Sequence, residues 1–236
     1  MRLAEPIVVV PADARPAAQS ACSRASARAG VLYGIAAYGL WGVFPVYFKA
    51  VKGVAAPEVL CHRILWSLVF LLGLMLWRRK WAAVYAALRS RRIMATLGMT
   101  TVLIAGNWLV FIWAVAHDHV LETSLGYFIN PLVNVLLGLV FLREWLRRRQ
   151  VFSVILAAVG VGYLTISAGH FPGWALFLAL SFGSYGLLRK TAPVDATVGL
   201  TVETALLAPL ALAYLGYQMH AGQATFGAGS LRMDAR

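Results

Sequence analysis

Several ionisable and aromatic side chains stand inside apolar stretches of this sequence, where each would be costly in hydrocarbon. The richest stretch contains Glu58, His62 and Trp66, spaced four residues apart, with Arg63 directly after His62. On a helix this spacing places the first three on one face and turns Arg63 by about 100°. An arginine at the centre of a bilayer costs about 2.5–3.5 kcal/mol on insertion scales. We therefore predict that His62 and Arg63 line a polar cavity that binds a solute or relays protons. Alternatively, Arg63 forms a structural ion pair with Glu58 or Glu203.

A second stretch places Asn107 next to Trp108. An asparagine side chain both donates and accepts hydrogen bonds, so Asn107 must find polar partners inside a helix bundle. We predict that this pair lies at the same cavity as Arg63.

A third stretch contains a proline between two asparagines, Asn130 and Asn134. Pro131 has no N–H, so it leaves the carbonyl of Tyr127 without its helical hydrogen bond. An opened carbonyl beside amides is one way in which transporter helices build polar sites, although a kink that serves packing alone is an equal alternative. The predicted cavity residues are Glu58, His62, Arg63, Trp66, Asn107, Trp108, Tyr127, Asn130, Asn134 and Glu203, with Pro131, Gly42 and Gly183 in structural roles.

Catalytic and metal-binding patterns find little support in the sequence. There is no Gly-x-Ser-x-Gly, His-Glu-x-x-His or phosphate-cradling glycine loop. His117, His119 and Glu122 form a weak ligand pattern that is more typical of a solvated turn. Cys22 and Cys61 stand in different environments and predict neither a disulfide nor a metal site. We expect no enzyme activity, no catalytic residue, no metal and no cofactor.

The composition requires a membrane. Hydrophobic residues make up 61% of the 236 residues, charged residues 13%, and the mean hydropathy is +0.74. A soluble domain carries about 25% charged residues. Seven apolar segments, at about 31–51, 57–77, 95–116, 123–142, 151–168, 173–188 and 197–217, have the length of bilayer-crossing helices. The sequence predicts an all-α polytopic membrane protein.

The cations predict its orientation. Most of the 21 Lys and Arg residues lie in the N-terminal arm and in loops 78–94, 143–150 and 189–196, whereas the loops after the third and fifth segments carry none. By the positive-inside rule the N-terminus is cytoplasmic. The apolar residues of 81–92 predict a helix along the membrane surface. The net charge of +12 is thereby explained without nucleic-acid binding.

A weak internal repeat appears at an offset of 141 residues. It aligns Gly42 with Gly183, Lys49 with Lys190, and His62 with Glu203. A second copy that begins after five crossings has the opposite orientation, so the repeat would be of the inverted kind.

Four strings carry a resemblance to a known family: AAYGLWGVFPVYFK, EVLCHRILWSLVF, GNWLVFIWAVAHDHVLETSLGYFINPLVNVLLGLVFLRE and SFGSYGLLRK. They resemble the RarD group of the EamA family, in the drug/metabolite transporter superfamily. The resemblance runs from about Gly30 to Tyr217 and implies ten helices in two inverted five-helix repeats. It also implies a permease of the cell inner membrane.

These observations predict four segments: a disordered cytoplasmic arm (1–29), a first EamA repeat (30–168), a partial second repeat (169–217) and a polar tail (218–236) that results from truncation or a frameshift. The expected function is secondary transport of a small solute by alternating access. The alternative is a non-transporting fragment or a membrane scaffold. The expected partners are the solute, the bilayer and, as an open option, a second copy of the chain.

Overall fold

The computed structural model describes residues 14–143, 145–167, 169 and 171–225, and describes side chains from residue 30 onward. This part of the chain contains eight α-helices and no strand. It divides into two units, residues 1–47 and 48–236, and each is described by itself. The predicted all-α class is confirmed.

The described residues of the first unit belong to a single helix, α1 (Ala14–Ala50), whose last three residues belong to the second unit. It begins inside the segment predicted as a disordered arm, in sequence rich in the good helix formers Ala and Arg. Residues 1–13 of that arm lie outside the described residues. Within the unit, Trp41 and Phe44 pack edge to face with ring centroids 6.2 Å apart.

The second unit contains seven helices, and each predicted apolar segment after the first lies in one of them. Most of their ends fall within about one helical turn of the prediction. The helices are α2 (Ala56–Arg78), α3 (Trp81–Arg89), α4 (Arg91–Ala116), α5 (Val120–Phe141), α6 (Arg148–Ser167), α7 (Gly173–Thr191) and α8 (Ala196–His220).

Local chemistry explains several helix ends. Asp195 begins α8 because its carboxylate accepts from the backbone N–H groups of Thr197 (3.0 Å) and Val198 (3.4 Å). Ser90 begins α4 in the same way, accepting from the Ile93 N–H at 3.4 Å. Arg79 ends α2 in the left-handed conformation, at φ 50°. In lipid, every backbone polar group must be hydrogen-bonded within the protein, and an α-helix makes these bonds within its own segment.

Six helices of the described chain are long and apolar enough to cross a membrane, counting residues Gly30–Ala50 of α1. The exception among the seven predicted crossings is α7. It forms a helix of 19 residues, but Ser181, Ser184, Tyr185 and the terminal Arg189 and Lys190 make it more polar. The chain is therefore a multi-pass membrane protein.

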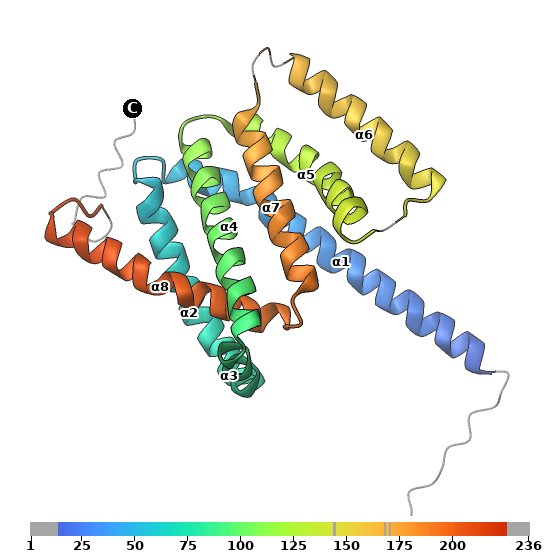
Figure 1. Ribbon diagram of the computed structural model, residues 1–236, viewed down its shortest axis with the longest axis horizontal. Coiled ribbons are helices and arrows are strands. Elements are labelled where there is room, and N and C mark those ends of the chain that lie inside the picture. The colour runs from blue at the N-terminus through green and yellow to red at the C-terminus, as the bar shows by residue number, and fades with distance from the viewer. Residues whose placement is uncertain (1–13, 144, 168, 170, 226–236) are drawn as a thin grey trace, which may run out of the picture. The chain divides into compact units, whose positions relative to one another are not determined.

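Four helix pairs form the core of the second unit: α5 with α7, α2 with α8, and α4 with both α7 and α8. Figure 1 shows α4 running beside α7. One apolar cluster joins Phe48 and Ile64 to Phe111 of α4 and Leu215 of α8, and another joins α5 to α7. Helix α6 packs along α5 and has no buried side chain.

Helix α3 forms where a surface-lying helix was predicted. Val84 and Ala87 are buried against α2, α4 and α8, while Trp81, Tyr85 and Leu88 are exposed. The predicted helix is confirmed, and its position at the membrane surface stays a prediction.

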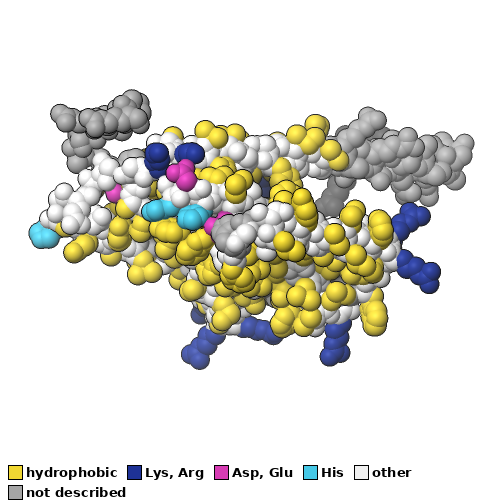
Figure 2. Space-filling model, turned by 90° about the horizontal axis from the view of Figure 1, so that it is seen from above, with side chains coloured by type: hydrophobic (Ala, Val, Ile, Leu, Met, Phe, Trp, Pro, Cys, Tyr) yellow, Lys and Arg dark blue, Asp and Glu magenta, His cyan; other side chains and the backbone are white. Residues whose placement is uncertain are grey.

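Large hydrophobic side chains are exposed over much of the described second unit. Figure 2 shows a broad hydrophobic surface with acidic, His and some Lys or Arg side chains close together near one edge, and further Lys and Arg side chains projecting from other edges. Such large exposed apolar areas are unsuited to water and suited to lipid.

Candidate functional site

Arg63 and Trp108, two of the predicted cavity residues, are in contact. The guanidinium carbon of Arg63 lies 3.8 Å from the centroid of the Trp108 ring, which joins α2 to α4. Both side chains are half-buried. The ring quadrupole attracts the cation at this distance, and the planar guanidinium can still bind a carboxylate through two parallel hydrogen bonds. A charged group is thus held in place inside a span and remains partly accessible.

The other predicted residues of α2 do not share one environment. Glu58 is 1% exposed and accepts a hydrogen bond from the Thr225 backbone N–H at 2.9 Å, whereas the Trp66 side chain is 71% exposed. His62 lies between these extremes. Each step of four residues turns a helix by about 400°, which is 40° more than a full turn. Glu58 and Trp66, eight residues apart, therefore point in directions about 80° apart. The structure therefore does not bring Trp66 together with Glu58.

Asn107 finds its partners inside the protein, as its chemistry required. Its side-chain amide donates to the Leu178 carbonyl (3.0 Å) and to the Ser181 hydroxyl (2.8 Å), both on α7. It is 8% exposed. Since these bonds use both amide hydrogens, the side chain joins α4 to α7 instead of opening toward a cavity.

The proline segment of α5 presents one exposed side. Tyr127, Pro131 and Asn134 are all exposed, while Asn130 is half-buried. The Asn130 side-chain oxygen is buried and has no hydrogen-bond partner among the described residues. Asn134 lines a pocket of about 280 Å³ between α5 and α7, together with Lys190 of α7.

Glu203 forms a different ion pair from the one predicted. Its carboxylate is 1% exposed and pairs with Arg189 of α7, with the Arg189 Nε atom 3.7 Å from Oε1. The hydroxyls of Thr100 on α4 (2.7 Å) and Tyr185 on α7 (3.3 Å) also donate to it. Arg63 is therefore not needed to neutralise this acid. We call Thr100, Tyr185, Arg189 and Glu203 the carboxylate cluster.

Three members of the carboxylate cluster were missed by the sequence analysis. Arg189 stands next to Lys190, and this pair was assigned to a cytoplasmic loop. In the structure Arg189 belongs to the last turn of α7 and donates to the Ala196 carbonyl at 3.1 Å. A Cβ atom at Gly199 would overlap its guanidinium group. The signal available in the sequence was Gly199, which stands one helical turn before Glu203 and leaves room for a large side chain.

The two predicted structural glycines differ. An ideal Cβ at Gly183 would lie 2.7 Å from the Val133 side chain and 3.3 Å from the Asn134 oxygen, so α7 approaches α5 closely there. At Gly42, within its own unit, no described atom lies within 4 Å of such a Cβ. Gly183 therefore lies at a close contact between α7 and α5, and the structural roles predicted for Gly183 and Gly42 stay predictions.

Sequence comparison identifies the group of proteins to which this arrangement belongs. The model of the EamA-like transporter family matches residues 28–166, more than half of the chain. This chain belongs to the EamA-like transporter family. The matched residues of this EamA protein include α2, α4 and α5, which carry most of the predicted cavity residues.

Three relatives illustrate the similarity. An uncharacterized transporter of Vibrio cholerae is 49% identical over 189 residues, 80% of this chain and 63% of its own length. RarD proteins of Salmonella typhimurium and Escherichia coli are 49% and 48% identical over 188 residues, 80% of this chain and 64% of their own length. The predicted resemblance to RarD proteins is confirmed. The chain spans less than two thirds of these relatives. No solved structure matches it significantly.

Proposed function

We propose that this chain acts in the transport of a small solute across the cell inner membrane, as a permease driven by a gradient. Family membership and the transporter names of relatives support this proposal. The observation that carries it is the Arg63–Trp108 contact, because it holds an accessible cation inside a membrane span. A purely structural arginine would be expected to be fully buried, whereas Arg63 is half-buried.

The proposed mechanism is alternating access between inverted halves, with the N-terminus in the cytoplasm. The 141-residue repeat makes α2 and α8 counterparts, and these helices pack against each other in the structure. A site that contains Arg63 would then lie next to the interface between the two halves.

The side chains favour a particular chemistry for the solute. Arg63 suits a carboxylate, and the Trp108 ring that supports it suits an aromatic or cationic group. We therefore propose a zwitterionic or aromatic compound of modest size.

Transport can be tested with proteoliposomes exposed to a defined mixture of isotope-labelled amino acids and aromatic acids, followed by mass spectrometry of the lumen. We expect at least one solute to accumulate above empty liposomes and at least a tenfold slower uptake in Arg63→Ala. Arg149→Ala, an exposed cation at the start of α6, is the matched control. Full uptake in Arg63→Ala with reduced thermal stability would instead give Arg63 a structural role.

The alternative is a membrane component that does not transport. A chimera that carries the remaining third of the Vibrio cholerae relative after Tyr217 separates the two functions. Uptake by the chimera alone would assign transport to the longer protein and packing to this chain. Absence of uptake in both proteins would contradict the proposal.

A further inference from the structure

A pocket outside the predicted cavity lies where the first turns of α5 and α7 meet. It has a volume of about 380 Å³, within the usual range for small-molecule sites. Its lining residues are Glu122 of α5, Gly173, Trp174 and Phe177 of α7, and Phe171, which precedes α7. One helical turn farther along α5, a Cβ at Gly126 would lie 3.1 Å from the Ala175 carbonyl oxygen, so the two helices touch next to the pocket.

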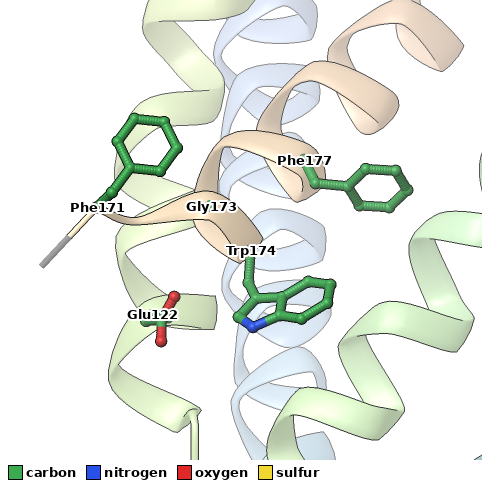
Figure 3. Close-up of a pocket in the computed structure, with 5 residues that line it drawn as sticks. All are labelled: Glu122, Phe171, Gly173, Trp174 and Phe177. Carbon is green, nitrogen blue, oxygen red and sulfur yellow. The ribbon is translucent and has the colours of Figure 1, made fainter.

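The lining combines one carboxylate with three aromatic rings. Figure 3 shows Glu122 on α5 close to the N-terminal turn of α7, with Phe171 and Trp174 the nearer of the three aromatic residues. The Glu122 side chain is 11% exposed and accepts a hydrogen bond from His119 at 3.0 Å. A carboxylate has about four acceptor positions, so one that is bonded within the protein can also accept from a ligand.

The aromatic wall is fixed by a second layer of rings. Trp174 packs on Trp113 of α4 with centroids 4.9 Å apart. His117 and His119 also stack on Trp113, with ring centroids 4.4 Å and 5.8 Å from its own. His119 therefore contacts both the carboxylate and the ring that supports Trp174, so Trp174 is pre-organised.

The charges near the pocket favour a cation. The described residues that line the pocket include no Lys or Arg. The neighbouring Asp118 is bound to Lys49 at 3.1 Å, which leaves Glu122 as the acidic residue of the lining. Aromatic faces beside a carboxylate attract organic ammonium groups by cation–π attraction and charge.

We infer that this pocket, formed by Glu122, Trp174, Phe171 and Phe177, binds the ammonium group of an organic cation. The shared chemistry is a methylated or primary ammonium group, whether it belongs to a free compound or to a lipid head group. Binding to this pocket can be tested separately from the proposed transport function, because it can be measured on the purified chain without any flux.

Choline and its uncharged isostere 3,3-dimethylbutan-1-ol test the inference. Saturation-transfer NMR can detect weak binding of either compound to the full chain. The detergent is dodecyl maltoside, which has no ammonium group. We expect saturable binding of choline and at least tenfold weaker binding of the isostere, a difference of about 1.4 kcal/mol. Equal binding of the two compounds would reduce the pocket to an apolar groove and overturn the inference.

Variants locate the site. Glu122→Gln, which preserves shape, should weaken choline binding at least tenfold, and Trp174→Leu by about two- to fivefold. Trp174→Phe keeps a ring and should bind better than Trp174→Leu, which guards against a folding defect. Asp118→Asn is the matched control, an acid on the same loop outside the lining, and should change binding less than twofold. A loss in Asp118→Asn as large as that in Glu122→Gln would contradict the assignment.

Nanodiscs distinguish the two sources of the ammonium group. If a lipid head group occupies the site, replacing part of the phosphatidylglycerol with phosphatidylcholine should raise the apparent Kd for choline. If a free cation occupies it, the Kd should stay constant between the two lipid compositions. Absence of choline binding in phosphatidylglycerol alone would overturn the inference in either form.

Discussion

Two glutamates in this protein show that the same type of side chain can occupy two different environments. Glu203 is 1% exposed and receives contacts from α4 and α7, including an ion pair with Arg189. Glu122 is 11% exposed, accepts from a neighbouring histidine and lines an open pocket. The carboxylate cluster is closed because several helices surround it. The Glu122 pocket is open because only the first turns of two helices meet there.

This difference means that burial alone does not identify a ligand site in a membrane protein. A buried carboxylate whose oxygens are already bonded within the protein joins helices together. A carboxylate beside fixed aromatic rings and open space can bind something else.

Removal of the cation from the closed site should have the largest effect. Arg189→Leu leaves the Glu203 carboxylate buried beside two hydroxyls and without its cation, which should cost about 3–5 kcal/mol of unfolding free energy. The double variant Arg189→Leu/Glu203→Leu should recover much of this loss, because neither charge remains. Steric-trapping measurements of unfolding test both variants, and equal losses in the single and double variants would refute the ion pair.

A methyl group at the helix contact beside the open site should have the next largest effect. Gly126→Ala places a Cβ atom 3.1 Å from the Ala175 carbonyl oxygen, so α5 and α7 must separate, at about 1–3 kcal/mol. Gly73→Ala on α2 is the control, since no described atom lies within 4 Å of its Cβ position. Similar unfolding free energies for the two variants would show that the α5–α7 contact is looser than described.

Neutralisation of the open carboxylate should change stability little. Glu122→Gln keeps the shape and hydrogen-bonding capacity of the side chain at a partly accessible position, so we expect a change within about 0.5 kcal/mol. A loss comparable to that in Arg189→Leu would show that Glu122, like Glu203, serves to hold helices together. Unfolding of both variants under the same conditions makes the comparison direct.

Acid should reveal a smaller effect at the start of α8. Hydrogen bonds from Thr197 and Lys80 hold the pKa of Asp195 well below its ordinary value. The carboxylate form therefore stabilises the fold above the unfolded-state pKa, near 3.8, and this contribution is lost as the pH falls through the lower folded-state value. Wild-type chain should lose more stability than Asp195→Asn between pH 5 and the acid limit of about pH 2. An equal loss of stability with acid in the two proteins would contradict this contribution of the carboxylate charge.

Much of the fold could be predicted from the sequence, and much less of the site. The segments from 57–77 to 197–217 became helices because their apolar length is dictated locally by the bilayer. The need of Asn107 for partners was also predictable, since a buried amide must be hydrogen-bonded. Its actual partners on α7 were not, because they lie more than 70 residues away.

Arg189 shows the limit most clearly. Its sequence neighbours, Lys190 and a following loop, are typical of a solvated cytoplasmic cation. The structure instead folds it over Gly199 and against Glu203, with the side chain 13% exposed.

The sequence by itself determined that this chain spans a membrane several times through helices, and which residues would be costly in lipid. Those properties depend on composition and on the periodicity of single segments. Only the tertiary structure decided that Glu203 pairs with Arg189 and that Arg63 lies over Trp108. It also decided that Glu122 lines a pocket together with three aromatic residues. Each of these contacts joins different helices, and their geometry depends on how those helices pack.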